Sequence, residues 1–222
     1  MYVHPAVDGE AWRALVRCAD RLYGVVLNAA DGPGDAPDHV LAAAAEELRG
    51  AGVRVLGYVD TGYGSRPHSA AVQDLVRYRD WYRTDGVYFD QAATEPELLP
   101  YHRRLTVAAR ALGAATVVLG HGTHPDPGYA DPDLGDLLVT FEGDWAAYQE
   151  AGVPRWTADH PPARFCHLVH GVPAGHGGLV ARTSRLRGAG VHCAVPGSGA
   201  NPWQSPPDSL RPGVPVPLGA DR

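Results

Sequence analysis

The sequence predicts an α/β protein with a compact (β/α)8 TIM-type barrel, and two observations predict it. Eight apolar, β-rich runs begin 21 to 33 residues apart, a spacing that fits one strand, one loop and one crossover helix. The runs are continuous rather than alternating, as in parallel strands buried on both faces. Eight such strands favour a closed barrel, which leaves no exposed sheet edge. The expected strands begin near Tyr2, Gly24, Val53, Gly86, Ala115, Asp136, Phe165 and Gly190.

Helical patterns separate most of these runs. Apolar residues recur at helical spacing over 12–19, 40–48, 105–112 and 179–186, and the last three stretches are followed by glycine. The segment His124–Asp133 instead contains three prolines. We therefore expect a loop in place of helix five.

The length and composition indicate one globular domain. The 222 residues are 45% hydrophobic and 20% charged, with no apolar run of about 18 residues that would span a bilayer. We expect a single barrel domain over residues 1–205, a Pro/Gly-rich tail over 206–222, no membrane partner and a monomer. The residues given carry no secretory signal.

The charge pattern argues against a nucleic-acid partner. The net charge is −6, and all 19 basic residues are arginines scattered along the chain. Cys18, Cys166 and Cys193 lie far apart, which excludes a disulfide scaffold and a CxxC metal knuckle. A neutral or cationic partner fits better, and we expect neither a metal nor a cofactor.

Polar residues stand where the predicted strands end. In a barrel of this kind, the carboxyl ends of the strands and the loops after them carry the site. Buried carboxylates are costly unless they are paired or solvated, so a shared polar cleft accounts for these residues together. The strand-end residues that we expect to line it are His4, Asn28, Tyr58, Asp60, Asp90, Gln91, His121 and Glu142.

Structural roles compete with this interpretation. Asp90 fits a helix N-cap, and Asp60 fits an ion pair with Arg66. His4 and His121 fit histidines satisfied at the edge of the core. Because no HxH or HExxH motif accompanies the histidines, a metal site is disfavoured.

Aromatic residues lie close to the same strand ends. Trp145 and Tyr148 are expected to pack within their own helix. Tyr63 and Trp203 lie in Gly- and Pro-rich loops, where an aromatic ring can serve as a platform for a sugar.

Asp90 and Glu142 are the expected catalytic pair. Glycosidic cleavage needs one carboxyl group to protonate the leaving oxygen and a second to attack or to stabilise the developing positive charge. The chain shows no nucleophile elbow and no phosphate loop, so a glycoside-cleaving site is the simplest interpretation. Paired acids also occur at unrelated sites, so this signal has low specificity.

Several longer strings resemble the spherulation-specific (spherulin-4) family. They are GVVLN with GPG (24–34), VRVLGYVDTGY (53–63), DWY before GVYFD (80–90), and TFEG (140–143). The resemblance covers residues 2 to about 203. It implies a secreted (β/α)8 glycoside hydrolase without a cofactor, related to fungal enzymes that cut α-1,4-linked N-acetylgalactosamine stretches of galactosaminogalactan, a biofilm exopolysaccharide.

The resemblance implies that Asp90 and Glu142 are functional, and it also exposes a departure. The family pattern Phe-Asp-Glu places a third acid at Gln91, and an amide cannot transfer a proton. Glu142 is then the general acid, and Asp90 is the nucleophile or the stabiliser of a step assisted by the 2-acetamido group. A carbohydrate-binding protein that has lost catalysis, or a barrel acting on a small metabolite, are the alternatives.

Overall fold

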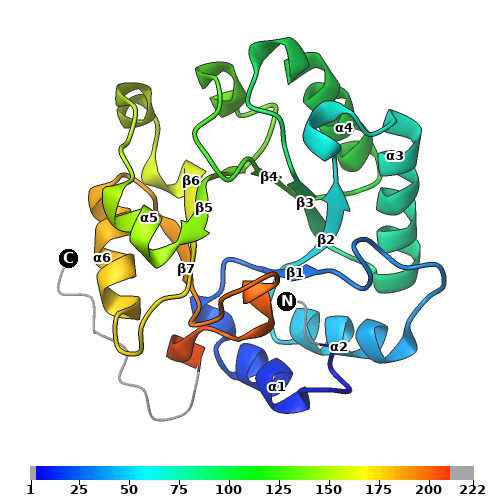
Figure 1. Ribbon diagram of the computed structural model, residues 1–222. Helices are drawn as coiled ribbons and strands as arrows, with labels where there is room; N and C mark the ends of the chain where they lie inside the picture. The colour runs from blue at the N-terminus through cyan, green and yellow to red at the C-terminus, as the bar shows by residue number, and fades with distance from the viewer. Residues whose placement is uncertain (1–3, 211–222) are drawn as a thin grey trace.

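The computed structural model describes residues 4–210 and shows a curled, all-parallel sheet of seven strands. The strands are hydrogen-bonded in chain order, so every connection leads to the adjacent strand. Figure 1 shows the helices on the outside of the curl. The strands are β1 (Val25–Leu27), β2 (Val55–Asp60), β3 (Gly86–Asp90), β4 (Thr116–Gly120), β5 (Leu137–Asp144), β6 (Phe165–His170) and β7 (Val191–Ala194).

Each of these strands begins within two residues of a predicted start. Their interior residues are almost all buried, which explains the continuous apolar runs. The eighth predicted strand, near Tyr2, falls on residues 1–3, which lie outside the described part of the chain. His4 belongs to no strand, and residues 5–7 form a turn.

The α-helices are α1 (Gly9–Arg17), α2 (His39–Gly50), α3 (His68–Arg77), α4 (Leu99–Ala111), α5 (Trp145–Glu150) and α6 (Gly177–Leu186). Aspartates cap three of them: the carboxylates of Asp8, Asp38 and Asp144 accept backbone N–H groups in the first turns of α1, α2 and α5. The helical periodicity over 12–19, 40–48, 105–112 and 179–186 corresponds to α1, α2, α4 and α6. Between β4 and β5, the helical element is the short 3-10 turn η5 (Pro127–Ala130).

Two acids brace the amino-terminal edge of the sheet. Asp85, directly before β3, accepts the N–H of Val55 at 2.8 Å. Asp136, directly before β5, accepts the N–H of Val117 and pairs with Arg110, both at 2.6 Å. These carboxylates satisfy backbone donors where strands begin, so they stabilise the end of the sheet opposite the candidate site.

The chain after β7 returns to the sheet. Its two 3-10 turns, η8 (Pro202–Gln204) and η9 (Asp208–Leu210), lie on the side of the curl between β7 and β1 (Figure 1). Leu210 is buried and lines a cavity with Leu15 and Val25. This part of the predicted tail is therefore packed against the sheet, while residues 211–222 lie outside the described chain.

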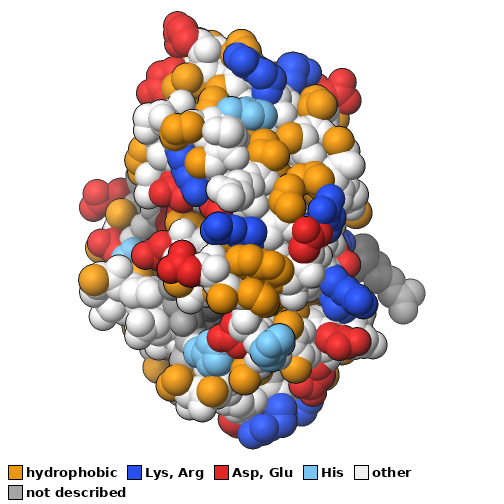
Figure 2. All heavy atoms as spheres, turned by 90° about the vertical axis from the view of Figure 1, so that its right-hand side faces the viewer, with side chains coloured by type: hydrophobic (Ala, Val, Ile, Leu, Met, Phe, Trp, Pro, Cys, Tyr) orange, Lys and Arg blue, Asp and Glu red, His pale blue; other side chains and the backbone are white. Residues whose placement is uncertain are grey.

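The outer surface mixes charges of both signs. In the view of Figure 2, arginines and acidic residues alternate with hydrophobic atoms on the side that carries α3 and α4. Among residues 4–210, the helices are too short or too polar to traverse a bilayer.

Close contact between β2 and the helix layer requires a glycine at position 57. A Cβ there would lie 2.5 Å from the ring of Tyr78, which belongs to the π-helical turn η3 (Tyr78–Tyr82) and is almost fully buried. By contrast, a Cβ at Gly50, in the last turn of α2, would meet no atom within 4 Å.

We predict that Gly57→Ala lowers the free energy of unfolding by about 2–3 kcal/mol, because the added methyl group overpacks the layer between sheet and helix. Gly50→Ala should be neutral or stabilising by up to about 1 kcal/mol. Chemical denaturation of both variants measures the difference. Equal stabilities would show that Tyr78 moves aside without cost.

Candidate active site

Asp90 reaches the site through strand periodicity. Side chains two residues apart share one face of a strand, and β2 and β3 are in a register that places Tyr58 beside Tyr88 and Asp60 beside Asp90. The rings of Tyr58 and Tyr88 stack at 6.4 Å, and the Tyr58 hydroxyl donates to Asp90 Oδ2 at 2.7 Å. Two neighbouring strands thus hold the Asp90 carboxylate in one position.

Glu142 reaches the site through a β-bulge. The pairing of β5 with β6 shifts between Val139 and Phe141, so β5 contains one extra residue, Thr140. Such a bulge changes the face to which the following side chains point. Phe141 packs on Tyr148 in the cluster under α5 and α6, while Glu142 faces the hollow inside the curl.

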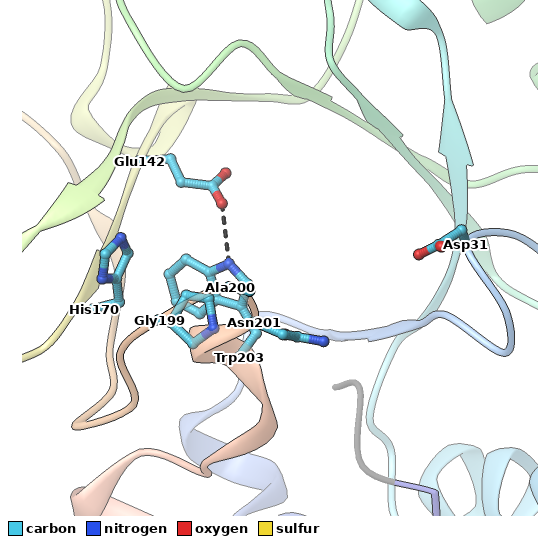
Figure 3. Close-up of a pocket in the computed structure, with 8 residues that line it drawn as sticks. Asp31, Glu142, His170, Gly199, Ala200, Asn201 and Trp203 are labelled. Carbon is cyan, nitrogen blue, oxygen red and sulfur yellow. Dashed lines mark hydrogen bonds between the residues drawn. The ribbon is translucent and has the colours of Figure 1, made fainter.

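Trp203 holds Glu142 from across the hollow. Its indole Nε1–H donates to Glu142 Oε1 at 3.0 Å, as the dashed line in Figure 3 marks. The rings of His170 and Trp203 are nearly perpendicular, and their centroids lie 5.9 Å apart. The segment after β7 therefore contributes a side chain directly to the position of Glu142.

Asp90 and Glu142 line the same cavity, which we call the apolar cavity and which measures about 240 Å³. Its polar side chains include Asn28, whose Oδ1 accepts the N–H of Gly32 and whose buried Nδ2 has no hydrogen-bond partner in the described chain. The other lining residues include Tyr58, Tyr88 and Trp203, with a mainly apolar remainder of Leu15, Leu22, Val25, Val26, Leu168, Val195, Pro206, Pro207 and Leu210. The strand ends thus converge on one hollow.

A second hollow, which we call the polar pocket, adjoins the first at Glu142 and Trp203 and measures about 400 Å³. Its side chains include Asp31, His170 and Asn201 (Figure 3). Glu142 therefore stands at the boundary between an apolar and a polar space.

Burial dominates the electrostatics of the two acids. Removal from water and, to a smaller extent, the negative charge of Asp90 raise the pKa of Glu142 to about 7, although the hydrogen bond from Trp203 opposes the rise. The pKa of Asp90 is also raised by burial, against the hydrogen bonds from the Tyr58 hydroxyl and the Gln91 N–H. Near neutral pH, Glu142 can therefore carry a proton beside an ionised Asp90, as an acid and carboxylate pair requires.

Two predicted binding residues lie elsewhere. His4 Nε2 contacts Asp38 Oδ2 at 3.0 Å beside the start of α2, and His4 lines neither hollow. His121 turns its Nδ1 to the carbonyl groups of Ala92 and Ala93, and burial lowers its pKa to about 4. Both histidines have structural partners in place of the predicted position in the cleft.

Asp60, Tyr63 and Gln91 shape the rim between β2 and β3. Asp60 Oδ1 accepts the N–H of Gly62 at 2.7 Å. The alternative role considered for Asp60, an ion pair with Arg66, does not form: Arg66 donates to the Asp60 carbonyl and pairs with Asp74. Tyr63 and Gln91 both have positive φ angles, near 50°, and the Tyr63 N–H donates to the Gln91 carbonyl.

This backbone conformation is unfavourable for residues with a Cβ and often occurs at functional sites. Asp31 adopts it as well, on the loop after β1. The Tyr63 side chain is 63% exposed and its ring is free to meet a ligand. At the rim, Tyr63 and Gln91 thus have a strained backbone, which hydrogen bonds hold in place.

The site residues expected from the sequence did not include Asp31, Tyr88, His170 and Asn201, which line these hollows. Tyr88 had a signal, because it precedes Asp90 by two residues and so shares its face. His170 was visible as the last residue of a strand. Asp31 and Asn201 lie on loops, where no periodicity indicates the direction of a side chain.

Residues 4–210 contain no group of three His, Cys, Asp or Glu side chains arranged to hold a metal.

A model of the family "Spherulation-specific family 4" matches residues 1–210. The chain belongs to this family. Spherulin-4 from Physarum polycephalum is 28% identical over 188 residues, which cover 79% of this chain and 55% of that protein, so the chain spans about half the length of this curated relative. The crystal structure of Aspergillus clavatus Sph3 in complex with GalNAc has a TM-score of 0.78 and 26% identity, covering 93% of this chain and 90% of that one.

The raised pKa of Glu142 predicts a stability that falls as pH rises. The native state binds this proton more tightly than the unfolded state, so the stabilisation is complete below about pH 4.5 and is lost as the pH rises through about 7. Glu142→Gln keeps an acceptor for Trp203 and cannot ionise. Between pH 4 and 8, the variant should gain about 1–3 kcal/mol of unfolding free energy relative to the wild type.

Denaturation at a series of pH values tests this. Glu47→Gln, at an exposed position on α2, is the matched control and should parallel the wild type. If the Glu142→Gln and Glu47→Gln curves coincide, Glu142 is not desolvated.

Proposed function

We propose that this chain is a glycoside hydrolase that cleaves an α-1,4-linked galactosamine or N-acetylgalactosamine polysaccharide with the carboxyl groups of Asp90 and Glu142. The observation that carries the proposal is that both acids line one cavity and that burial raises both pKa values. The likeness to Sph3, which was crystallised with GalNAc, supports a hexosamine ligand. The endo mode of attack belongs to the same proposal.

The proposal includes a complete (β/α)8 barrel. Seven parallel strands in chain order and the outer helices supply most of such a barrel. The site would then occupy the carboxyl ends of the strands, where barrels of this kind carry their chemistry.

In the proposed mechanism, Glu142 is the general acid. Its proton passes to the glycosidic oxygen as the bond from the anomeric carbon to that oxygen breaks, and the leaving sugar departs as an alcohol. Asp90 supplies the negative charge that the anomeric carbon needs, either by bonding to it directly or by stabilising the 2-acetamido group as that group attacks. Water then attacks the anomeric carbon, the bond from that carbon to Asp90 or to the acetamido oxygen breaks, and the Glu142 carboxylate accepts the proton that the water loses.

Other groups at the hollows would hold the sugar. The unpaired Nδ2 of Asn28 can donate to a hydroxyl oxygen, and the Tyr58 hydroxyl orients Asp90. Trp203 and the exposed ring of Tyr63 offer faces for stacking. Asp60 and Gln91 shape the rim on which these groups stand.

A second function is favoured by Gln91. If the acid that the family pattern places there is the essential proton donor, this chain binds the glycan without cutting it. The raised pKa of Glu142 argues for turnover, because it leaves a proton donor in the hollow. Binding of an oligosaccharide without product would favour the binding protein.

We predict that Asp90→Asn and Glu142→Gln each lower kcat on galactosamine-containing oligosaccharides by about 10²–10⁴-fold, because each removes one half of the acid and carboxylate pair. Mass spectrometry of released fragments measures this, and Glu47→Gln is the control with full activity expected. A wild-type protein that releases nothing from acetylated or deacetylated oligomers would rule out the hydrolase.

The pH dependence of kcat follows from the sign of the Glu142 shift. A general acid acts only while protonated, so kcat should fall as the pH rises through about 7. Initial rates between pH 4 and 9 test this. Full activity at pH 9 would exclude Glu142 as the proton donor.

A further inference from the structure

The polar pocket is lined by two carboxyl groups and one imidazole: Asp31 is exposed, Glu142 carries a proton near neutral pH, and His170 lies beside them. Its described lining of eight residues includes Asp31 and Glu142, and it contains neither arginine nor lysine. Its volume of about 400 Å³ lies within the range of roughly 300–1,000 Å³ that small-ligand sites occupy. A pocket of this composition attracts a cation and repels an anion.

Asp31 points into this pocket from the side opposite Glu142 (Figure 3). Neither a hydrogen bond nor an ion pair joins its carboxylate to another residue in the described range 4–210, and the residue is exposed. The other exposed carboxylate on the same loop, Asp35, does not line the pocket. Asp31 is therefore a negative charge available to a ligand.

The loop that carries Asp31 is held in place by buried tyrosines. The Tyr78 hydroxyl donates to the Leu27 carbonyl at 3.0 Å, and the Tyr82 hydroxyl donates to the Pro33 carbonyl at 2.9 Å. The Asn28 side chain closes the loop by accepting the N–H of Gly32. Asp31 itself has a φ of 50°. A strained residue fixed on both sides is preorganised and loses little entropy when it binds.

The pocket also contains polar atoms that lack a partner. Asn201 Oδ1 and His170 Nδ1 are buried and have no hydrogen-bond partner in the described chain. An amide oxygen accepts hydrogen bonds, and a ring nitrogen accepts or donates according to its tautomer. Both atoms are closed off from solvent, so Asp31 is the accessible acidic group of the pocket.

We propose that the polar pocket binds an amino sugar whose amine is free and protonated, and that Asp31 selects this sugar over its N-acetylated form. This inference rests on the proposed function and identifies the sugar next to Glu142 as deacetylated galactosamine. The ammonium group pairs with the Asp31 carboxylate. An acetamido group carries no charge and gains nothing from Asp31.

The test compares two oligomers of equal length, galactosamine and N-acetylgalactosamine, at pH 6 and low salt. Calorimetric affinities are measured for the wild type, Asp31→Asn and Asp35→Asn, with released fragments followed in parallel by mass spectrometry. Asn adopts the left-handed backbone as readily as Asp, so Asp31→Asn removes the charge without disturbing the loop. Asp35→Asn removes the same charge from the same loop outside the pocket.

Asp31→Asn should weaken binding of the galactosamine oligomer about three- to tenfold, leave the acetylated oligomer unchanged and reduce the salt dependence, while Asp35→Asn changes neither affinity. The inference is overturned if both variants behave alike, if Asp31→Asn affects both oligomers equally, or if the galactosamine oligomer does not bind. The predicted binding pattern without released fragments would refute the hydrolase and uphold this inference. Cleavage of both oligomers that is unchanged in Asp31→Asn would uphold the hydrolase and refute this inference.

Discussion

The account of this protein depends on the burial of two carboxyl groups beside one hollow. Each acid costs free energy when it is ionised away from water, and the charge of Asp90 adds to the cost of ionising Glu142. The structure offsets part of this cost with hydrogen bonds from neutral donors: Asp90 accepts from the Tyr58 hydroxyl and the Gln91 N–H, and Glu142 accepts from Trp203. No arginine neutralises either acid through an ion pair in the described chain. The pair thus keeps the raised pKa values that proton transfer near neutral pH needs.

The two ends of the sheet use acids in opposite ways. Where strands begin, Asp85 and Asp136 accept backbone N–H groups, so these carboxylates serve stability. Where strands end, Asp90 and Glu142 face a hollow, and their desolvation costs stability. The core between the sheet and the outer helices stabilises the fold, so the fold tolerates this loss of stability at the carboxyl ends of the strands. Functional sites commonly carry such a cost.

The sequence predicted the seven strands because each contains or adjoins a short apolar run. It predicted Asp90 and Glu142 because a buried carboxylate at the end of such a run is costly unless it is paired or solvated. It could not predict the bulge at Thr140, which shifts the pairing of β5 with β6 just before Glu142 and leaves no mark in an apolar run. His121 misled the prediction because it also follows a strand. The carbonyl groups that hold it come from residues 92 and 93, on a different loop.

Asp31 shows a second limit of prediction from the sequence. Its position depends on Tyr78 and Tyr82, about fifty residues away in the chain, whose hydroxyls bond the carbonyl groups on either side of the loop. Neither the Gly-Pro-Gly that follows Asp31 nor its charge indicates which way the side chain points. The contacts that create the polar pocket are long-range, including the return of Trp203 to Glu142 across sixty-one positions.

The most direct measurement is a carbon NMR titration of the Glu142 carboxyl group in the wild type and in Asp90→Asn. The account predicts a midpoint near pH 7 in the wild type, and a lower midpoint in the variant because the charge of Asp90 is gone. A wild-type midpoint near 4.5 that does not respond to Asp90→Asn would contradict it.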